Sequence, residues 1–261
     1  AWGRFGWWQL RCRLQDEVVV PWMAGQKLVM RRGMRGATGN LYVGLMEFVD
    51  MMLPLHFLRS GDHFLDVGAN VGSYTVLASG VCGARTWAFE PDPQTSIHLR
   101  RNISINRLEP LTTVFDCALG DTSKSVPFTV GLDTINSVAD ARHKNTRIVR
   151  QEPLDALIGT SQPIMVKIDV EGYEEQVLLG ARDLLSRRCL KLIEIETVTP
   201  TSLDLIVNAG FERAYYEPFT RALRRRSDGF MTSNSYFVRD WSFVQERLAT
   251  GKPVEILGST I

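Results

Sequence analysis

Short apolar segments alternate with amphipathic ones along most of the chain, beginning near residue 62. Strands buried on both faces are apolar throughout, whereas the helices that cover them carry one apolar face. The alternation therefore predicts an α/β fold with a mostly parallel sheet and helices on both faces. The expected strands are 63–67, 85–90, 112–117, 164–169 and 190–196, the expected helices are 71–79, 93–106, 173–186 and 240–249, and 211–216 and 235–238 are expected to close the sheet as an antiparallel pair.

The first 59 residues do not follow this alternation, and we expect them to form an N-terminal extension to a main domain of residues 60–261. Pro54 is expected to bend or end the last helix of the extension, because proline has no N–H to donate. The expected elements are an aromatic helix over 1–14, a β-hairpin from 18–20 and 27–30, a Gly-rich connection over 33–39 and a helix over 42–58.

The composition is that of an ordinary globular protein, with 44% apolar residues, 23% charged residues and a formal net charge of +1. A nearly neutral chain creates no field that favours nucleic acid, so we expect no nucleic-acid partner. The cysteines form no CxxC pair and no histidine cluster lies beside them, so we expect reduced thiols in a cytoplasmic protein without a metal site. These cysteines are Cys12, Cys82, Cys117 and Cys189.

Aromatic and basic residues share the first fourteen positions. We expect a helix there that packs on its own domain; a helix that docks on a partner or lies on a membrane surface is the alternative, and would make the protein membrane-peripheral. The aromatic residues are Trp2, Phe5, Trp7 and Trp8, and the basic ones are Arg4, Arg11 and Arg13.

A tight glycine-containing turn joins the first strand of the main domain to the next helix. In open α/β sheets, ligands bind beyond the carboxyl ends of the strands, where glycines let the backbone approach and a helix N-terminus offers N–H groups. A dinucleotide-binding turn would have a glycine where Asn70 stands, between Gly68 and Gly72. A side chain there favours a nucleoside without pyrophosphate, and Asp66 would attract a cationic amino or sulfonium group.

The next two strands also end in acidic residues. Glu90 follows the second strand, where a carboxylate can accept hydrogen bonds from both hydroxyls of a ribose. Asp116 follows the third strand and could accept from the exocyclic amine of adenine, with Cys117 beside the ring. A solvated acid is the alternative for each residue alone, but together they favour an adenosine site.

The fourth strand carries the candidate chemistry. Lys167 lies within an apolar strand, where an unpaired ammonium is costly, so we expect it to pair with Asp169 or Glu194. If the nucleoside carries a sulfonium, transfer of its methyl group would need mainly alignment of the acceptor. An alcohol acceptor would additionally need its proton removed. Asp169, Glu171 and His143 are the candidates for that step, although helix capping is the alternative for Glu171.

In these motifs the chain resembles the FkbM family of S-adenosylmethionine-dependent methyltransferases. The resemblance rests on "DVGANVG", "FEPDP", "LRRNISIN", "ALGD" and "VKIDVEGYEEQVLLGA" and covers about 58–196. It implies a seven-stranded class I methyltransferase (Rossmann-like) sheet with the last strand antiparallel. It also implies S-adenosyl-L-methionine as cofactor and O-methylation of a hydroxyl, commonly on a sugar, glycolipid, polysaccharide or polyketide.

The resemblance assigns roles to individual residues. Asp66, Gly68, Asn70 and Gly72 would hold the methionine part, Glu90 the ribose, and Asp116 with Cys117 the adenine. Asp169 and Glu171 would face the methyl group or the acceptor, and Tyr42 and Glu47 could face the site from a lid over the cofactor.

Several interpretations stay open on the sequence alone. A nicotinamide-dependent (NAD(P)) oxidoreductase on a similar sheet and a non-catalytic binding module are the alternatives to a methyltransferase. We expect contacts to a small-molecule or glycan acceptor from the insert 131–150, which holds Asn136 and His143. The basic run 221–226 is expected to be a solvated loop, with binding of a phosphate, an acidic sugar or RNA phosphates as the alternative.

Overall fold

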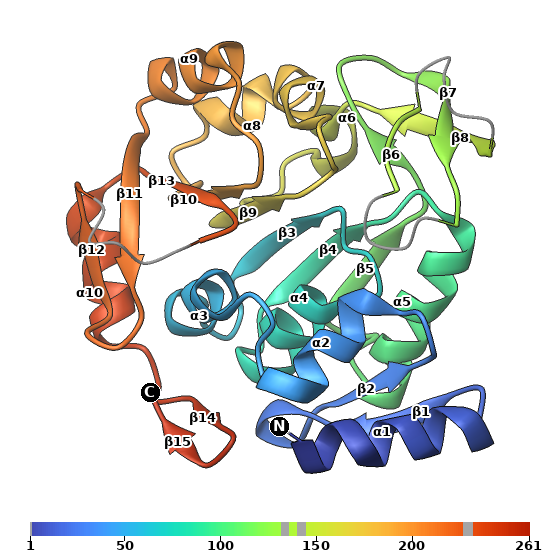
Figure 1. The fold of residues 1–261 in the computed structure, drawn as a ribbon. Coiled ribbons are helices and arrows are strands. Elements are labelled where there is room, and N and C mark those ends of the chain that lie inside the picture. Colours follow the sequence, from blue (N-terminus) through green and yellow to red (C-terminus); the bar gives the residue numbers. More distant parts are fainter. Residues whose placement is uncertain (1, 132–135, 140–144, 227–231) are drawn as a thin grey trace.

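The computed structural model describes residues 2–131, 136–139, 145–226 and 232–261 (Figure 1). Its largest sheet has eight strands in the order β12-β11-β13-β10-β9-β3-β4-β5. The strands are β3 (His63–Val67), β4 (Arg85–Phe89), β5 (Thr112–Phe115), β9 (Met165–Ile168), β10 (Leu192–Ile195), β11 (Glu212–Glu217), β12 (Ala222–Arg224) and β13 (Ser235–Val238).

The parallel part of this sheet confirms the expected class I methyltransferase (Rossmann-like) architecture. β5, β4, β3, β9 and β10 pair in parallel, and β13 inserts antiparallel between β10 and β11. The sheet has one strand more than the seven expected, because β12 pairs with β11 as a hairpin at the edge. Sequence reasoning took this segment for a basic loop, but charged residues are also typical of an exposed edge strand.

Helices cover both faces of the sheet, as its alternating side chains require (Figure 1). Phe64 of β3 lies in a core cluster with α3 and α10, whereas the next residue, Leu65, lies in a cluster with α6 to α9 on the opposite face. The helices are α3 (Phe48–Phe57), α4 (Ser73–Val76) with a π-helical turn η2 (Leu77–Val81), α5 (Pro93–Ile105), α6 (Leu154–Ile158), α7 (Glu174–Leu179), α8 (Arg182–Ser186), α9 (Pro200–Asn208) and α10 (Trp241–Ala249).

The helices of the N-terminal segment have different bounds from those expected. The predicted hairpin is present as β1 (Val18–Pro21) and β2 (Lys27–Met30), joined by a 3-10 turn, η1 (Met23–Gly25). Part of the expected Gly-rich connection forms α2 (Arg35–Val43), and the expected helix over 42–58 is divided between α2 and α3. Gly44 ends α2 with a φ of 85°, a conformation that favours glycine, whereas α3 continues past Pro54.

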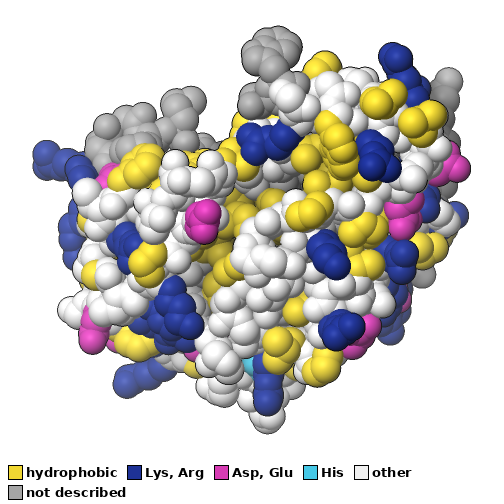
Figure 2. Space-filling view, turned by 90° about the horizontal axis from the view of Figure 1, so that it is seen from below, with side chains coloured by type: hydrophobic (Ala, Val, Ile, Leu, Met, Phe, Trp, Pro, Cys, Tyr) yellow, Lys and Arg dark blue, Asp and Glu magenta, His cyan; other side chains and the backbone are white. Residues whose placement is uncertain are grey.

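The N-terminal helix α1 (Trp2–Leu14) packs on the domain through one side only. Trp8 is buried in a cluster with β1, β2 and α2. Phe5, Trp7 and Leu10 remain exposed, so a contact with a membrane or a partner stays a prediction. The face seen from below in Figure 2 intersperses Lys and Arg with hydrophobic side chains and is hollowed.

Two small sheets complete the fold. Where an irregular insert was expected, β6 (Ala118–Leu119), β7 (Lys124–Thr129) and β8 (Thr146–Glu152) form a three-stranded sheet in the order β6-β8-β7. A C-terminal hairpin of β14 (Glu255–Ile256) and β15 (Ser259–Thr260) was not predicted. In the described ranges, no helix combines the length and the apolar character that crossing a membrane requires.

Candidate functional site

A cavity of about 350 Å³ lies beyond the carboxyl ends of the parallel strands. This volume is within the usual range of small-molecule sites, roughly 300 to 1,000 Å³. Residues located just after the ends of four neighbouring strands, β4, β3, β9 and β10, form one side of the cavity. The segment before α3 and the β6–β8 region supply further walls. The residues used below that line it are Met46, Glu47, Met51, Gly68, Asn70, Tyr74, Glu90, Cys117, Leu119, Phe128, Asn136, Lys167, Asp169, Glu171, Tyr173 and Glu196.

The turn after β3 comes close to the end of β9. Gly68 has a φ of 79°, and a Cβ on it would lie 1.8 Å from the carbonyl oxygen of Asp169. Only glycine therefore allows this approach. Asn70 lines the cavity with a φ of 51°, whereas Gly72 packs against Leu99 and does not line it.

Asp66 lies inside the sheet rather than on the cavity wall. Its side chain is fully buried, and the Thr75 hydroxyl donates to its Oδ2 atom. Burial raises the pKa of Asp66, and Lys167 opposes this shift. Of the four loop residues predicted to hold the methionine part, Gly68 and Asn70 line the cavity, whereas Asp66 and Gly72 lie behind it.

Glu90 is held rigidly at the cavity by two turns. Its Oε2 atom accepts from the backbone N–H of Asn70 at 3.0 Å, and its Oε1 atom accepts from that of Asp92 at 2.8 Å. Each carboxylate oxygen can accept a further hydrogen bond. The side chain is 6% exposed, and burial, with Asp92 as the next neighbour that raises it, brings the pKa of Glu90 to about 8.

The two residues predicted to contact adenine lie in different places. Asp116 points to the surface, where it pairs with Arg100 at 2.8 Å and accepts from the Ser96 hydroxyl. Cys117 is buried and lines the cavity together with Leu119. This wall of the cavity is therefore apolar.

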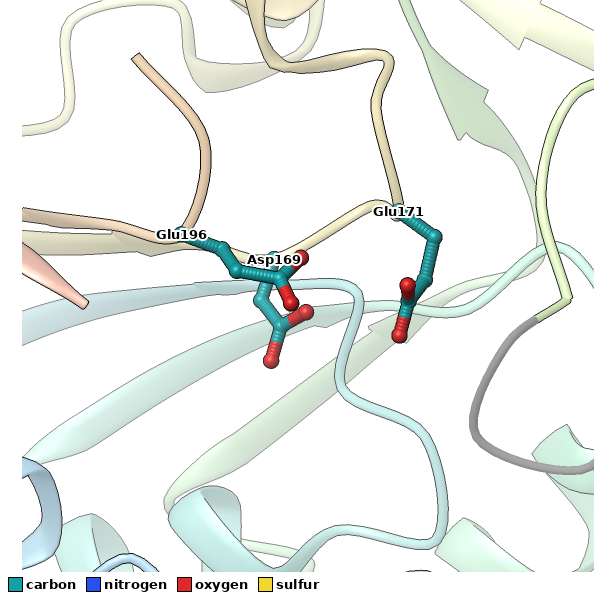
Figure 3. A group of neighbouring side chains, drawn as sticks. All are labelled: Asp169, Glu171 and Glu196. Atoms are coloured by element: carbon teal, nitrogen blue, oxygen red, sulfur yellow. The ribbon is translucent and has the colours of Figure 1, made fainter. Parts of the chain in front are cut away.

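Three carboxylates gather at the ends of β9 and β10 (Figure 3). Asp169, Glu171 and Glu196 each have an oxygen within 4.8 Å of the others. Glu196 was not predicted. The sequence did hold a signal, since Glu196 directly follows β10 as Asp169 follows β9, and the register places Ile195 beside Ile168.

Lys167 supplies the positive charge beside these acids. Its ammonium lies 2.7 Å from Asp169 Oδ2, which confirms the expected ion pair. The ammonium also lies 4.4 Å from the centre of the Tyr74 ring. Burial alone would lower the pKa of Lys167, but Asp169, followed by Asp66, raises it above the usual value. Carboxylates spaced this closely can bind a cation, but the lysine already balances Asp169, and we assign no metal to them.

A polar network ties α3 and the segment before it to the sheet. The Tyr74 hydroxyl lies 2.8 Å from a carboxylate oxygen of Glu47 and 3.1 Å from one of Glu194, and its single proton can be donated to either. Tyr236 donates to Asp50 of α3 at 2.5 Å. Glu47 also lines the cavity, and its role in a lid stays a prediction. Tyr42 instead packs against Phe5, 5.8 Å away, and does not line the cavity.

The remaining predicted residues are distributed as follows. His143 lies outside the described residues, whereas Asn136 of the same insert lines the cavity. The basic run 221–226 includes β12 at the far edge of the sheet and does not line the cavity; Arg225 pairs with Glu212 there.

Residues 66–215 match the family model described as the methyltransferase FkbM domain. This chain belongs to the FkbM methyltransferase family. It is 28% identical over 145 residues to the hexuronic acid methyltransferase AglP of Haloferax volcanii, a match that covers 55% of this chain and 59% of that relative. The match thus spans less than two thirds of the relative's length.

Two solved structures are similar in arrangement. A methyltransferase FkbM from Methylobacillus flagellatus has a TM-score of 0.47 and 18% identity over 71% of this chain and 48% of its own. A precorrin-6y C5,15-methyltransferase from Geobacter metallireducens has a TM-score of 0.41 and 16% identity over 74% of this chain and 87% of its own.

Proposed function

We propose that this protein transfers the methyl group of S-adenosyl-L-methionine to a hydroxyl of a glycan acceptor, such as a sugar, glycolipid or polysaccharide, or of a polyketide-type compound. Membership of the FkbM methyltransferase family supports methyl transfer. The observation that carries the proposal is the order of groups along one cavity. Glu90 follows β4, Gly68 and Asn70 follow β3, Asp169 follows β9 and Glu196 follows β10.

This order suits an elongated nucleoside with a cationic end. Strands lie about 4.8 Å apart, so β4 and β10 are separated by roughly 14 Å. At the β4 end, Glu90 can accept from the two ribose hydroxyls, and the apolar wall at Cys117 and Leu119 suits a purine ring. At the other end, Asp169 attracts the amino and sulfonium charges. The close approach at Gly68 leaves room for the methionine part between them.

The chain's own residues supply alignment and shelter. Bound S-adenosylmethionine supplies an electrophilic methyl group, and holding the acceptor in line with it can contribute about 7 to 11 kcal/mol. Met46, Glu47 and Met51 cover the cavity beside α3, while Tyr74 fixes Glu47 by a hydrogen bond. These contacts would exclude water from the reacting atoms.

We infer an acceptor with a sugar ring, and a hexuronic acid is the first one to test because the relative AglP is named for it. Phe128, Asn136 and Tyr173 line the cavity from the β7–β8 insert and the turn before α7. Aromatic rings can pack on the apolar face of a sugar, and the Asn136 amide can bond its hydroxyls.

The test is transfer of tritium-labelled methyl groups from S-adenosylmethionine to three acceptor sets: uronic acid glycosides, neutral hexose glycosides and a glycolipid extract. We expect label on a sugar in a form that withstands mild alkali, because ethers survive treatment that hydrolyses methyl esters. Alkali-labile label would mean a carboxylate acceptor and would overturn the hydroxyl assignment.

Glu90→Ala tests the ribose contact in the same assay. The variant should raise the KM for S-adenosylmethionine at least tenfold, the equivalent of about 1.4 kcal/mol, because the hydrogen bonds between Glu90 and the ribose hydroxyls are lost. Glu109→Ala, at an exposed position after α5, is the matched control and should leave KM unchanged. An unchanged KM in Glu90→Ala would refute the ribose assignment.

A further inference from the structure

We propose that Glu196 is the catalytic base that accepts the proton of the acceptor hydroxyl, and that Asp169 and Lys167 act as a positioning pair beside it. This inference rests on the proposed function and selects one acid from the three in Figure 3. The selection follows from how each acid is held and from the charges around it.

Asp169 is already engaged. Its Oδ2 atom lies 2.7 Å from the ammonium of Lys167, whose side chain is 3% exposed. A proton added to Asp169 would leave that buried ammonium without its closest counter-charge, which is costly. Asp169 is therefore committed to its ion pair with Lys167, and its carboxylate lies beside that of Glu196.

Glu171 does not directly follow a strand, unlike Asp169 and Glu196. It lies in the turn between β9 and α7 with a φ of 55°. That turn is stabilised by Glu174, whose Oε1 atom accepts from the N–H groups of Val170 and Gly172. Glu171 contributes its charge to the cluster from the opposite side (Figure 3).

Glu196 has the surroundings of a base that works near neutral pH. Its backbone N–H donates to the Ile168 carbonyl at 3.1 Å, which fixes it at the edge of the sheet beside Asp169. Burial is the largest cause that raises the pKa of Glu196, followed by the facing carboxylates Asp169, Glu171 and Glu174, and together they bring it to about 8. A base of this strength is ionised in about a tenth of the molecules at pH 7 and can take a proton more readily than an ordinary carboxylate.

In the proposed step, one bond forms as another breaks, and a proton moves to Glu196. The hydroxyl oxygen of the acceptor forms a bond to the methyl carbon while the methyl–sulfur bond breaks, and the electron pair of that bond stays on sulfur. The hydroxyl proton moves to the carboxylate of Glu196 and is then released to water. Glu196 is thereby regenerated without an oxidant or a metal.

The activity test compares Glu196→Gln with Glu171→Gln in methyl transfer to 4-nitrophenyl β-D-glucuronide between pH 6 and 9.5. In the wild type, kcat/KM should rise with pH and level off above about pH 8. Glu196→Gln should lower kcat by roughly 10² to 10⁴-fold and remove the rise, while binding S-adenosylhomocysteine as the wild type does. Glu171→Gln should keep the rise and move it to lower pH, because one repelling charge is lost.

A second measurement needs no acceptor. Carboxyl carbons of ¹³C-labelled glutamate are titrated by NMR, and the Glu196 signal is assigned by its loss in Glu196→Gln. Titration near pH 8 supports the inference, and titration at the ordinary glutamate value of about 4.3 overturns it, whether or not the probe is methylated. A Glu196→Gln variant with kcat within threefold of the wild type also overturns it. Failure of the wild type to bind S-adenosylhomocysteine would instead refute the proposed function.

Discussion

Replacing Lys167 by methionine removes a buried ammonium that lies among several acids beside the cavity. Asp169 contacts it directly, and Asp66, Glu47 and Glu194 raise its pKa through their charges. Breaking a buried ion pair by removing one partner costs about 3 to 5 kcal/mol. Against a total stability of about 5 to 15 kcal/mol, this loss is a large fraction.

The loss should depend on pH with a defined sign. The folded pKa of Lys167 is raised, so its stabilisation is complete at neutral pH and is lost only above the ordinary lysine pKa of about 10.4. Asp66 has a raised pKa mainly through burial, so folding becomes less favourable as pH rises above about 3.9. Without Lys167 to oppose that shift, the variant should lose more stability between pH 5 and pH 8 than the wild type does.

The assay is urea unfolding at pH 5 and pH 8. Lys124→Met is the matched control, because Lys124 also pairs with an aspartate, Asp121, but at a 43% exposed position where such pairs contribute about 0 to 1 kcal/mol. A Lys167→Met variant within about 1 kcal/mol of the wild type at pH 8 would refute the reasoning.

Two further variants test the walls of the cavity. Gly68→Ala should abolish binding of S-adenosylhomocysteine in calorimetry, because the new Cβ would meet the Asp169 carbonyl. Gly258→Ala is the control: Gly258 also has a positive φ but faces open space, so this variant should bind normally. Equal binding by both variants would contradict this account. Tyr74→Phe removes the donor shared by two carboxylates and should lower the free energy of unfolding by about 1 to 3 kcal/mol. Unchanged urea unfolding would show that the hydrogen bonds of Tyr74 contribute little.

The parallel sheet could be predicted from sequence because most positions of its strands are apolar. β9 and β10 are buried at every position, and their hydrophobic segments are unambiguous. β12 and the β6–β8 sheet were not predicted, because their short or polar segments become strands only through pairing with another strand, β11 for β12 and β8 for β6 and β7. Tertiary pairing decided those segments rather than local preference.

The candidate site was predictable where residues follow directly on a strand. Glu90, Asp169 and Glu171 could be found by counting from strand ends, and all line the cavity. Asp66 was expected to face the ligand, but its position within β3 directs it into the sheet. Glu196 was not predicted, because in the sequence it is a single acidic residue after a strand, as many solvent-exposed acids are. Only the pairing of β10 with β9 places Asp169 beside it.

Calorimetric titration of the wild-type protein with S-adenosylhomocysteine and, separately, with NAD tests the central claim most directly. The account predicts one site for S-adenosylhomocysteine and no heat of binding for NAD. Binding of NAD without binding of S-adenosylhomocysteine would contradict it.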